Sequence, residues 1–160
     1  MKRTTRQLDD ALLLYPELSA AQQRSVQRRI KAGELKSVVK GFVSSLPESE
    51  WPSLVARNRI RVLAAFFPMT VLGYRTAFAG GAPSKDTVHL VGTYRRTVNL
   101  PGLTVQVWKG PPMQATDVPM QASSIYFPTQ ERLRLENLTP NRGANANAQR
   151  TLRALCHLNA

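Results

Sequence analysis

Two glutamines and two arginines within one short stretch carry the side chains best suited to a chemical role. Gln23, Arg24, Gln27 and Arg28 bring together amides and guanidinium groups. Glutamine and arginine can bond the edges of bases through paired hydrogen bonds, and arginine also binds phosphate. Lys31 extends the set, because residues 24, 28 and 31 have the i, i+4, i+7 spacing of one helix face. These residue types predict contact with duplex DNA.

The sequence around this stretch is rich in positive charge. The whole chain has 22 basic and 10 acidic residues, which gives a formal charge of +12. Arg24 to Arg61 holds nine of the basic residues and three of the acidic ones, so the excess is concentrated there. Such an excess indicates a polyanionic partner: nucleic acid, an anionic membrane or an acidic protein. Lys36 and Lys40 are expected to reach the DNA backbone beside the residues described above.

Residue types that enzymes use are present but not assembled into a site. His89 lies in the middle of a predicted strand, where a solvated or structural role is favoured, and His157 lies beside the end of the sequence. Glu131 and Glu136 are five residues apart and fall on different faces of a predicted helix. The lone Cys156 can form neither an internal disulfide nor a thiolate metal site, and no P-loop, GxSxG or HExxH motif occurs. We therefore expect no enzymatic activity, no metal site and no cofactor.

A helix is predicted to position the cationic side chains. Ser19 is a suitable N-cap for a helix that runs to about Ala32, where Gly33 ends it. Val26 and Ile30 share the face nearly opposite to that of the cations. One side of the helix can therefore pack while the other remains accessible.

A small basic hairpin is predicted directly after this helix. Residues 35–39 and 42–44 have the character of two short strands, and Lys40-Gly41 forms the turn between them. A helix with a cationic face, followed by a glycine stop and a basic hairpin, is the layout of a winged helix. The sequence thus predicts a winged-helix-like segment.

Two further helices are predicted on either side of this segment. Residues 6–14 form a short one, whose N-terminus Asp9 and Asp10 would favour. Residues 52–67 form a longer one that is apolar on two sides, as expected for a helix between other elements. Asn58 falls on an apolar face of this helix and is expected to bond to a loop backbone.

The second half of the chain is richer in predicted strands. Strands are expected at 70–72, 87–93, 97–100, 103–108 and 124–127, and helices at 74–79 and 129–138. The three runs between 87 and 108 are expected to form a meander.

The predicted fold class is therefore α+β. A winged-helix-like segment, 1–46, precedes an α/β region, 47–140, with a three- to four-stranded, mostly antiparallel sheet. Residues 141–160 are predicted to be a linker and a C-terminal helix.

Four stretches, in their order and spacing, resemble the AbiEi-type antitoxins and related N-terminal modules that precede Fic-type domains. They are RRIKAGELKSVVKGFVSS, WPSLVARNRIRVLAAFFPMTVLGYRTAFAGG, HLVGTYRRTVNLPGLTVQVWKGP and IYFPTQERLRLENLTPNRG. The similarity covers roughly Val26 to Gly143. In that family a winged helix precedes an α/β region. The family usually has a fuller helix-turn-helix before this point, whereas residues 15–18 leave little room for one.

The resemblance implies an antitoxin of a type IV toxin–antitoxin system, a phage-defence function. Such antitoxins bind repeats in their own promoter, repress transcription and counter a nucleotidyltransferase-like toxin. Residues 19–32 would be the reading helix and residues 35–44 the wing. The expected DNA-binding residues are Gln23, Arg24, Gln27, Arg28, Lys31, Lys36 and Lys40.

A second function remains open: a non-enzymatic protein-interaction module, or a subunit of a larger phage-defence or Fic-associated assembly. The β-rich half supports it. RNA binding is disfavoured because aromatic residues are not clustered on strands, and membrane-surface binding because the cationic helix lacks a large apolar face. No apolar run reaches the ~20 residues of a membrane span, and the N-terminus does not have the pattern of a signal peptide. We therefore expect a cytoplasmic protein.

Overall fold

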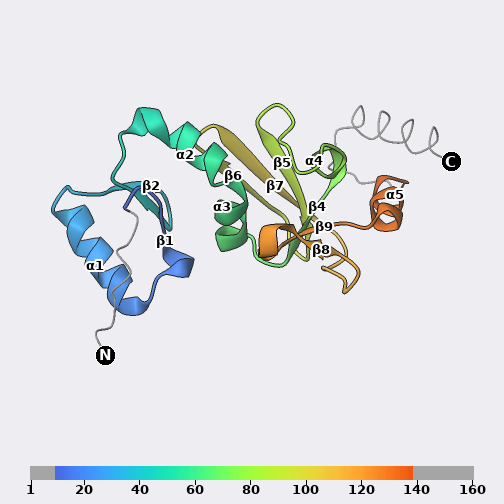
Figure 1. Cartoon of the computed structure of the whole chain (residues 1–160), viewed down its shortest axis with the longest axis horizontal. Coiled ribbons are helices and arrows are strands. Elements are labelled where there is room, and N and C mark those ends of the chain that lie inside the picture. Colours follow the sequence, from blue (N-terminus) through green and yellow to red (C-terminus); the bar gives the residue numbers. More distant parts are fainter. Residues whose placement is uncertain (1–9, 139–160) are drawn as a thin grey trace.

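The computed structural model describes residues 10–138, which form two β-sheets with helices packed on and between them (Figure 1). The helix and linker predicted for 141–160, and the first part of the helix predicted for 6–14, lie outside the described residues. A small sheet with one long helix lies at one end of the molecule, and a larger sheet lies toward the other (Figure 1).

The first part of the chain forms the small sheet and its helix. It contains β1 (Leu13–Leu14), the 3-10 helix η1 (Tyr15–Glu17), α1 (Ala20–Lys31), β2 (Lys36–Val39) and β3 (Phe42–Ser44). A second 3-10 helix, η2 (Glu48–Glu50), leads into α2 (Trp51–Arg57) and α3 (Arg59–Phe66).

The remaining elements form the large sheet and its short helices. They are β4 (Thr70–Leu72), α4 (Tyr74–Phe78), β5 (Thr87–Gly92), β6 (Arg96–Leu100), β7 (Leu103–Lys109), β8 (Val118–Pro119), η3 (Met120–Ala122), β9 (Ile125–Phe127) and α5 (Gln130–Leu138). The mixed helix-and-strand class expected from the sequence is therefore confirmed.

The small sheet is antiparallel, with the strand order β1-β3-β2. Its two faces are buried by different parts of the chain. Leu13 and Val43 pair across the sheet and pack with Val26 of α1. Leu14 and Phe42 are the next pair, and they belong to the main core together with α2 and α3. Because successive side chains of a strand point to opposite faces, one face of the small sheet is buried against α1 and the other against the main core.

The short helix predicted for 6–14 is wrong at its described end, because Leu13 and Leu14 form a strand. Their apolar character reflects burial on both faces of the small sheet rather than one stripe of a helix. Asp10 does not cap a helix in the described residues. Its carboxylate receives two hydrogen bonds of 2.7 Å from the guanidinium of Arg29.

Helix α1 has the limits that its sequence predicts. The Ser19 hydroxyl accepts a hydrogen bond from the Gln22 backbone, and the Gln22 side chain accepts one from the Ser19 backbone. This reciprocal capping box satisfies two of the N–H groups that a helix start leaves free. At the other end Gly33 has a φ of +79°, a left-handed conformation that suits glycine.

The long helix predicted for 52–67 is two helices, which meet at Asn58. Asn58 has the non-helical angles φ −109° and ψ 21°. Its side-chain amide donates to the carbonyl of Leu54 at 3.0 Å, so the expected bond to a loop is wrong. The expectation that this segment lies between other elements agrees with the packing: Val62 and Leu63 share one core with Phe42 of the small sheet and with strands of the large one (Figure 1).

The large sheet is mixed and has six strands, in the order β6-β7-β5-β4-β9-β8. The pairs β5–β7 and β4–β9 are parallel, and the other three pairs are antiparallel. The predicted size of three to four strands is therefore wrong, and so is the predicted meander, because β5 and β7 pair directly. The expected predominance of antiparallel pairing agrees with three of the five strand pairs. β5 and β4 are the two central strands, and β7 lies on the other side of β5. The more exposed β6 forms one edge of the sheet and connects to β7 through a turn at Gly102.

Candidate nucleic-acid interface

The cationic face of α1 points away from the molecule. Val26 is 1% exposed and holds the opposite face of the helix against the small sheet. Arg24, Arg28 and Lys31 are exposed, and the side chain of none of them forms a hydrogen bond or ion pair with another described residue. Figure 1 shows α1 on the outer side of the small sheet, far from the large sheet. These three charges are therefore accessible to a large ligand.

The two glutamines of the predicted site have different roles. Gln23 is half-buried, and its amide nitrogen donates to the carbonyls of Tyr15 and Leu18 at 3.0 and 3.2 Å. Both of its donors are therefore used to hold η1 against α1. The outward, base-contacting role expected for Gln23 disagrees with this geometry, because Gln23 lies underneath the cationic face as a framework residue.

Gln27 is exposed and lies beside Arg28 on the accessible side of α1. Its amide nitrogen donates to the hydroxyl of Tyr15 at 2.6 Å. Tyr15 was not among the residues expected at the site. No local pattern links it to Gln27, because the two are twelve positions apart and belong to different elements, η1 and α1.

An open groove runs between η1 and α1, along the helix from Ala20 to Arg28. It has a volume of about 910 Å³, and it is lined by Tyr15, Ala20, Ala21, Gln23, Arg24, Gln27 and Arg28. Four of the seven expected site residues thus line one groove.

The hairpin residues of the predicted site lie apart from the groove. Lys40 is exposed at the β2–β3 turn and has no ion-pair partner among the described residues. Lys36 is exposed and lies 3.6 Å from a carboxylate oxygen of Glu48. An exposed pair at this distance is weak and open to exchange. Both lysines therefore remain exposed on the hairpin.

Other cations of the basic stretch are used inside the molecule. Arg29 is paired with Asp10 and with Glu34, and these hydrogen bonds raise the pKa of the guanidinium. The same contact holds the pKa of Asp10 below its usual value. Arg61 forms an ion pair with Glu17 of η1 at 2.6 Å. The structure thus separates structural arginines from the accessible ones, a distinction that net charge does not make.

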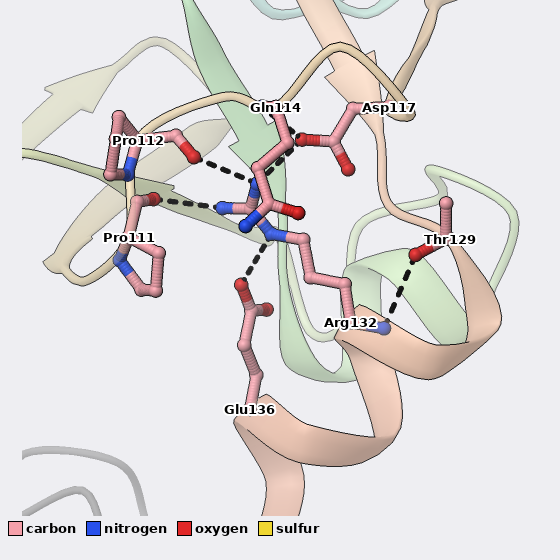
Figure 2. A network of polar contacts seen from close by, with 7 residues as sticks. All are labelled: Pro111, Pro112, Gln114, Asp117, Thr129, Arg132 and Glu136. Atoms are coloured by element: carbon pink, nitrogen blue, oxygen red, sulfur yellow. Dashed lines mark hydrogen bonds and ion pairs between the residues drawn. The ribbon is translucent and has the colours of Figure 1, made fainter.

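A buried polar network lies far from this surface, between α5 and the loop before β8 (Figure 2). The guanidinium of Arg132 donates to the carboxylates of Asp117 and Glu136 and to the carbonyls of Pro111 and Pro112. All three charged side chains are at most 8% exposed. Burial raises the pKa of Glu136, against the opposing effect of its hydrogen bond from Arg132. This network fastens α5 to the loop.

His89 has a structural environment of the kind expected from the sequence. Its Nδ1 accepts a hydrogen bond of 3.2 Å from the indole of Trp108, and the two rings are stacked. Burial lowers the pKa of His89, and the charge of Arg75 lowers it further. Within residues 10–138 there is no group of three or more histidine, cysteine, aspartate or glutamate side chains that could hold a metal ion. His157 and Cys156 lie outside that range.

Comparisons with family models, curated proteins and solved structures find no match to this chain. Among the described helices, none has the length and apolar character required to cross a membrane. The resemblance to AbiEi-type antitoxins therefore stays a prediction from the sequence.

Proposed function

We propose that this protein binds duplex DNA through the outer face of α1, with the β2–β3 hairpin as a wing. It would act as an antitoxin-like transcriptional regulator in the cytoplasm, recognising promoter repeats without enzymatic activity. The single observation that carries the proposal is that Arg24, Arg28 and Lys31 are exposed, unpaired within the described residues and backed by a packed helix.

The arrangement of α1 supports contact with a major groove. A recognition helix reaches base edges with its N-terminal residues, while cations around it bind phosphates. Helix α1 borders the open groove from Ala20 to Arg28, and Lys40 of the hairpin could contact the backbone beside it. Lys36 is paired with Glu48 and is not counted among the phosphate contacts below. The hairpin follows the helix after Gly33, as the winged-helix interpretation requires.

The salt dependence of DNA binding tests the proposal. If Arg24, Arg28, Lys31 and Lys40 each neutralise one phosphate, the logarithm of the association constant should fall with the logarithm of salt concentration with a slope of about −3.6. Replacing Arg24 and Arg28 by alanine should reduce the slope to about −1.8. Between 50 and 200 mM salt, this corresponds to an affinity loss of roughly 150-fold for the wild type and roughly 12-fold for the variant.

A matched variant distinguishes the effect of this surface on DNA binding from the effect of net charge. Lys109→Ala with Arg134→Ala also removes two exposed positive charges, but from β7 and α5. It should keep the wild-type slope. A flat salt dependence of the wild type, or equal slopes for both double variants, would exclude α1 as the phosphate-binding surface.

The antitoxin part of the proposal needs a partner. A nucleotidyltransferase-like toxin encoded beside this protein should be neutralised when the two are expressed together. Because such antitoxins act without necessarily forming a stable complex, growth rescue is the measurement. Toxicity that persists with soluble, DNA-binding protein present would leave a DNA-binding regulator without antitoxin activity.

A protein-interaction module is the second candidate function, and one observation favours it. The exposed guanidinium of Arg95 lies 5.1 Å from the centre of the Trp108 ring, which also stacks on His89. An arginine held over an aromatic ring is pre-ordered for contact with an acidic partner, and arginine is enriched in interfaces. Binding of such a partner should be lost in Arg95→Ala and retained when Arg24 and Arg28 are replaced by alanine.

A further inference from the structure

The contact between Tyr15 and Gln27 carries an inference that rests on the proposed function and makes it more specific. We infer that Gln27, held in place by the hydroxyl of Tyr15, reads an adenine in the major groove. Gln27 would be the specificity-determining residue, and Tyr15 would be its positioning residue.

The hydrogen-bonding capacity of Gln27 fits one base. Its amide nitrogen has two hydrogens, and one of them is directed at the Tyr15 hydroxyl oxygen at 2.6 Å. The second hydrogen and the amide oxygen have no partner among the described residues. A glutamine binds adenine with this pair of atoms: the oxygen accepts from the N6 amino group and the N–H donates to N7. The bond to Tyr15 therefore restricts the amide without using the atoms that read the base.

Tyr15 is itself fixed from two sides. Its backbone N–H donates to the carbonyl of Gly41 in the hairpin turn at 2.8 Å. Its own carbonyl accepts the bond from Gln23 of α1. Its side chain packs on the cluster formed by Val26 and its neighbours. The hydroxyl is therefore placed by the junction of wing and helix, which makes the orientation of Gln27 a property of the whole N-terminal segment.

Gln27 is the only glutamine of α1 that meets these conditions. The donors of Gln23 are used internally, and the side-chain oxygen of Gln22 is used in the capping box. Gln27 also lines the groove together with Arg24 and Arg28, whose guanidinium groups can bind phosphates on either side of the base. Holding a side chain in its bound orientation reduces the entropy that binding must remove. The amide should consequently discriminate bases better than a freely rotating one.

Selection of binding sites from a randomised duplex library, followed by sequencing, tests this assignment. The wild type should enrich sites with an adenine at one fixed position. Gln27→Ala should lose that preference, with a fall in discrimination of about tenfold or more at that position only. Tyr15→Phe keeps the ring and removes the hydroxyl, so it should weaken the same preference by a smaller factor. Affinity for a non-specific duplex should stay within about twofold for both variants.

Two control variants remove the same chemical groups elsewhere. Gln130→Ala changes an exposed glutamine of α5, and Tyr94→Phe removes the hydroxyl of an exposed tyrosine beyond β5. Both should keep the adenine preference. The thermal midpoint of every variant should be measured, so that a loss of preference in Tyr15→Phe is interpreted only at a temperature where the protein is folded.

The outcomes separate this inference from the proposed function. Salt-dependent binding without any base preference, or an adenine preference that survives Gln27→Ala, would overturn the role of Gln27 and leave DNA binding standing. A preference unchanged in Tyr15→Phe would overturn the positioning role of Tyr15. Absence of DNA binding altogether would overturn both proposals.

Discussion

Replacing Arg132 by methionine should lower the free energy of unfolding by about 3–5 kcal/mol, because it removes the cation from a buried ionic network. The Arg132 side chain is 4% exposed, and those of Asp117 and Glu136 are 0% and 8% exposed. Methionine has a similar length and is apolar, so the cavity left behind is small. The loss comes mainly from two carboxylates that remain buried without a positive charge.

The contacts of the guanidinium support this magnitude. It bonds Asp117 at 2.5 Å and Glu136 at 2.8 Å, and it bonds the carbonyls of Pro111 and Pro112 at 2.9 and 2.8 Å (Figure 2). Hydrogen bonds to charged groups contribute about 1.5–3 kcal/mol each. One oxygen of each carboxylate accepts no hydrogen bond from a described residue. Asp117 keeps one other donor, the backbone N–H of Gln114 at 2.8 Å, whereas Glu136 has no second donor among the described residues.

Urea unfolding followed by circular dichroism is the appropriate assay, with Arg134→Met as the matched control. Arg134 is exposed on the same helix, so its replacement should change stability by less than about 0.5 kcal/mol. The thermal midpoint of Arg132→Met should fall by roughly 6–20 °C. Acidification should narrow the stability difference between Arg132→Met and the wild type, because burial raises the pKa of Glu136 and its protonation removes one unpaired buried charge. A loss similar to that of Arg134→Met, with an unchanged m-value, would refute the reasoning.

Three further predictions concern the titration of Glu136, the close packing of Gly102 and the N-cap of α1. Because burial raises the pKa of Glu136 above 4.5, the folded state holds that proton more tightly, and this stabilisation is lost as pH rises through the folded-state pKa. Glu136→Gln should therefore gain stability relative to the wild type as pH increases above 4.5 in urea titrations, and a constant difference would contradict the assignment. Gly102 and Gly80 both have positive φ, but a Cβ at Gly102 would lie 2.9 Å from Pro52, whereas one at Gly80 would meet nothing within 4 Å. Gly102→Ala should thus lower the free energy of unfolding, measured with urea, by about 1–3 kcal/mol more than Gly80→Ala does. Equal decreases would mean that Pro52 can move away from the new Cβ at no energetic cost. Ser19→Ala should cost about 0.5–2 kcal/mol in the same assay by removing the capping box, and an unchanged midpoint would show that the cap contributes nothing.

Elements specified by neighbouring residues could be predicted from the sequence. The capping box of Ser19 acts over three positions, and Gly33 and Gly41 supply left-handed turns where the chain needs them. The limits of α1 and of the β2–β3 hairpin follow from such local interactions. The opposition of Val26 to the arginines also follows from the period of the helix alone. For the same reason, the accessible side of α1 was correctly expected to be cationic.

The pairing of strands could not be predicted in this way. Leu14 pairs with Phe42, and β4 lies next to β9 although more than fifty residues separate them. Short apolar runs fit several partners equally well, and the choice depends on which arrangement buries the most surface. The parallel neighbours β5 and β7 illustrate this, because a local rule would have joined each of them to β6.

The sequence by itself determined the charge, the caps and turns, and a helix that carries cations on one face. Only the tertiary structure decided which cations are accessible: Arg29 and Arg61 are paired with acids from other elements, while Arg24 and Arg28 are not. It also decided that Gln27 and Tyr15 form one unit. Ion pairs and side-chain contacts between elements depend on how distant segments approach one another, and that approach is set by burial of the common core rather than by spacing along the chain.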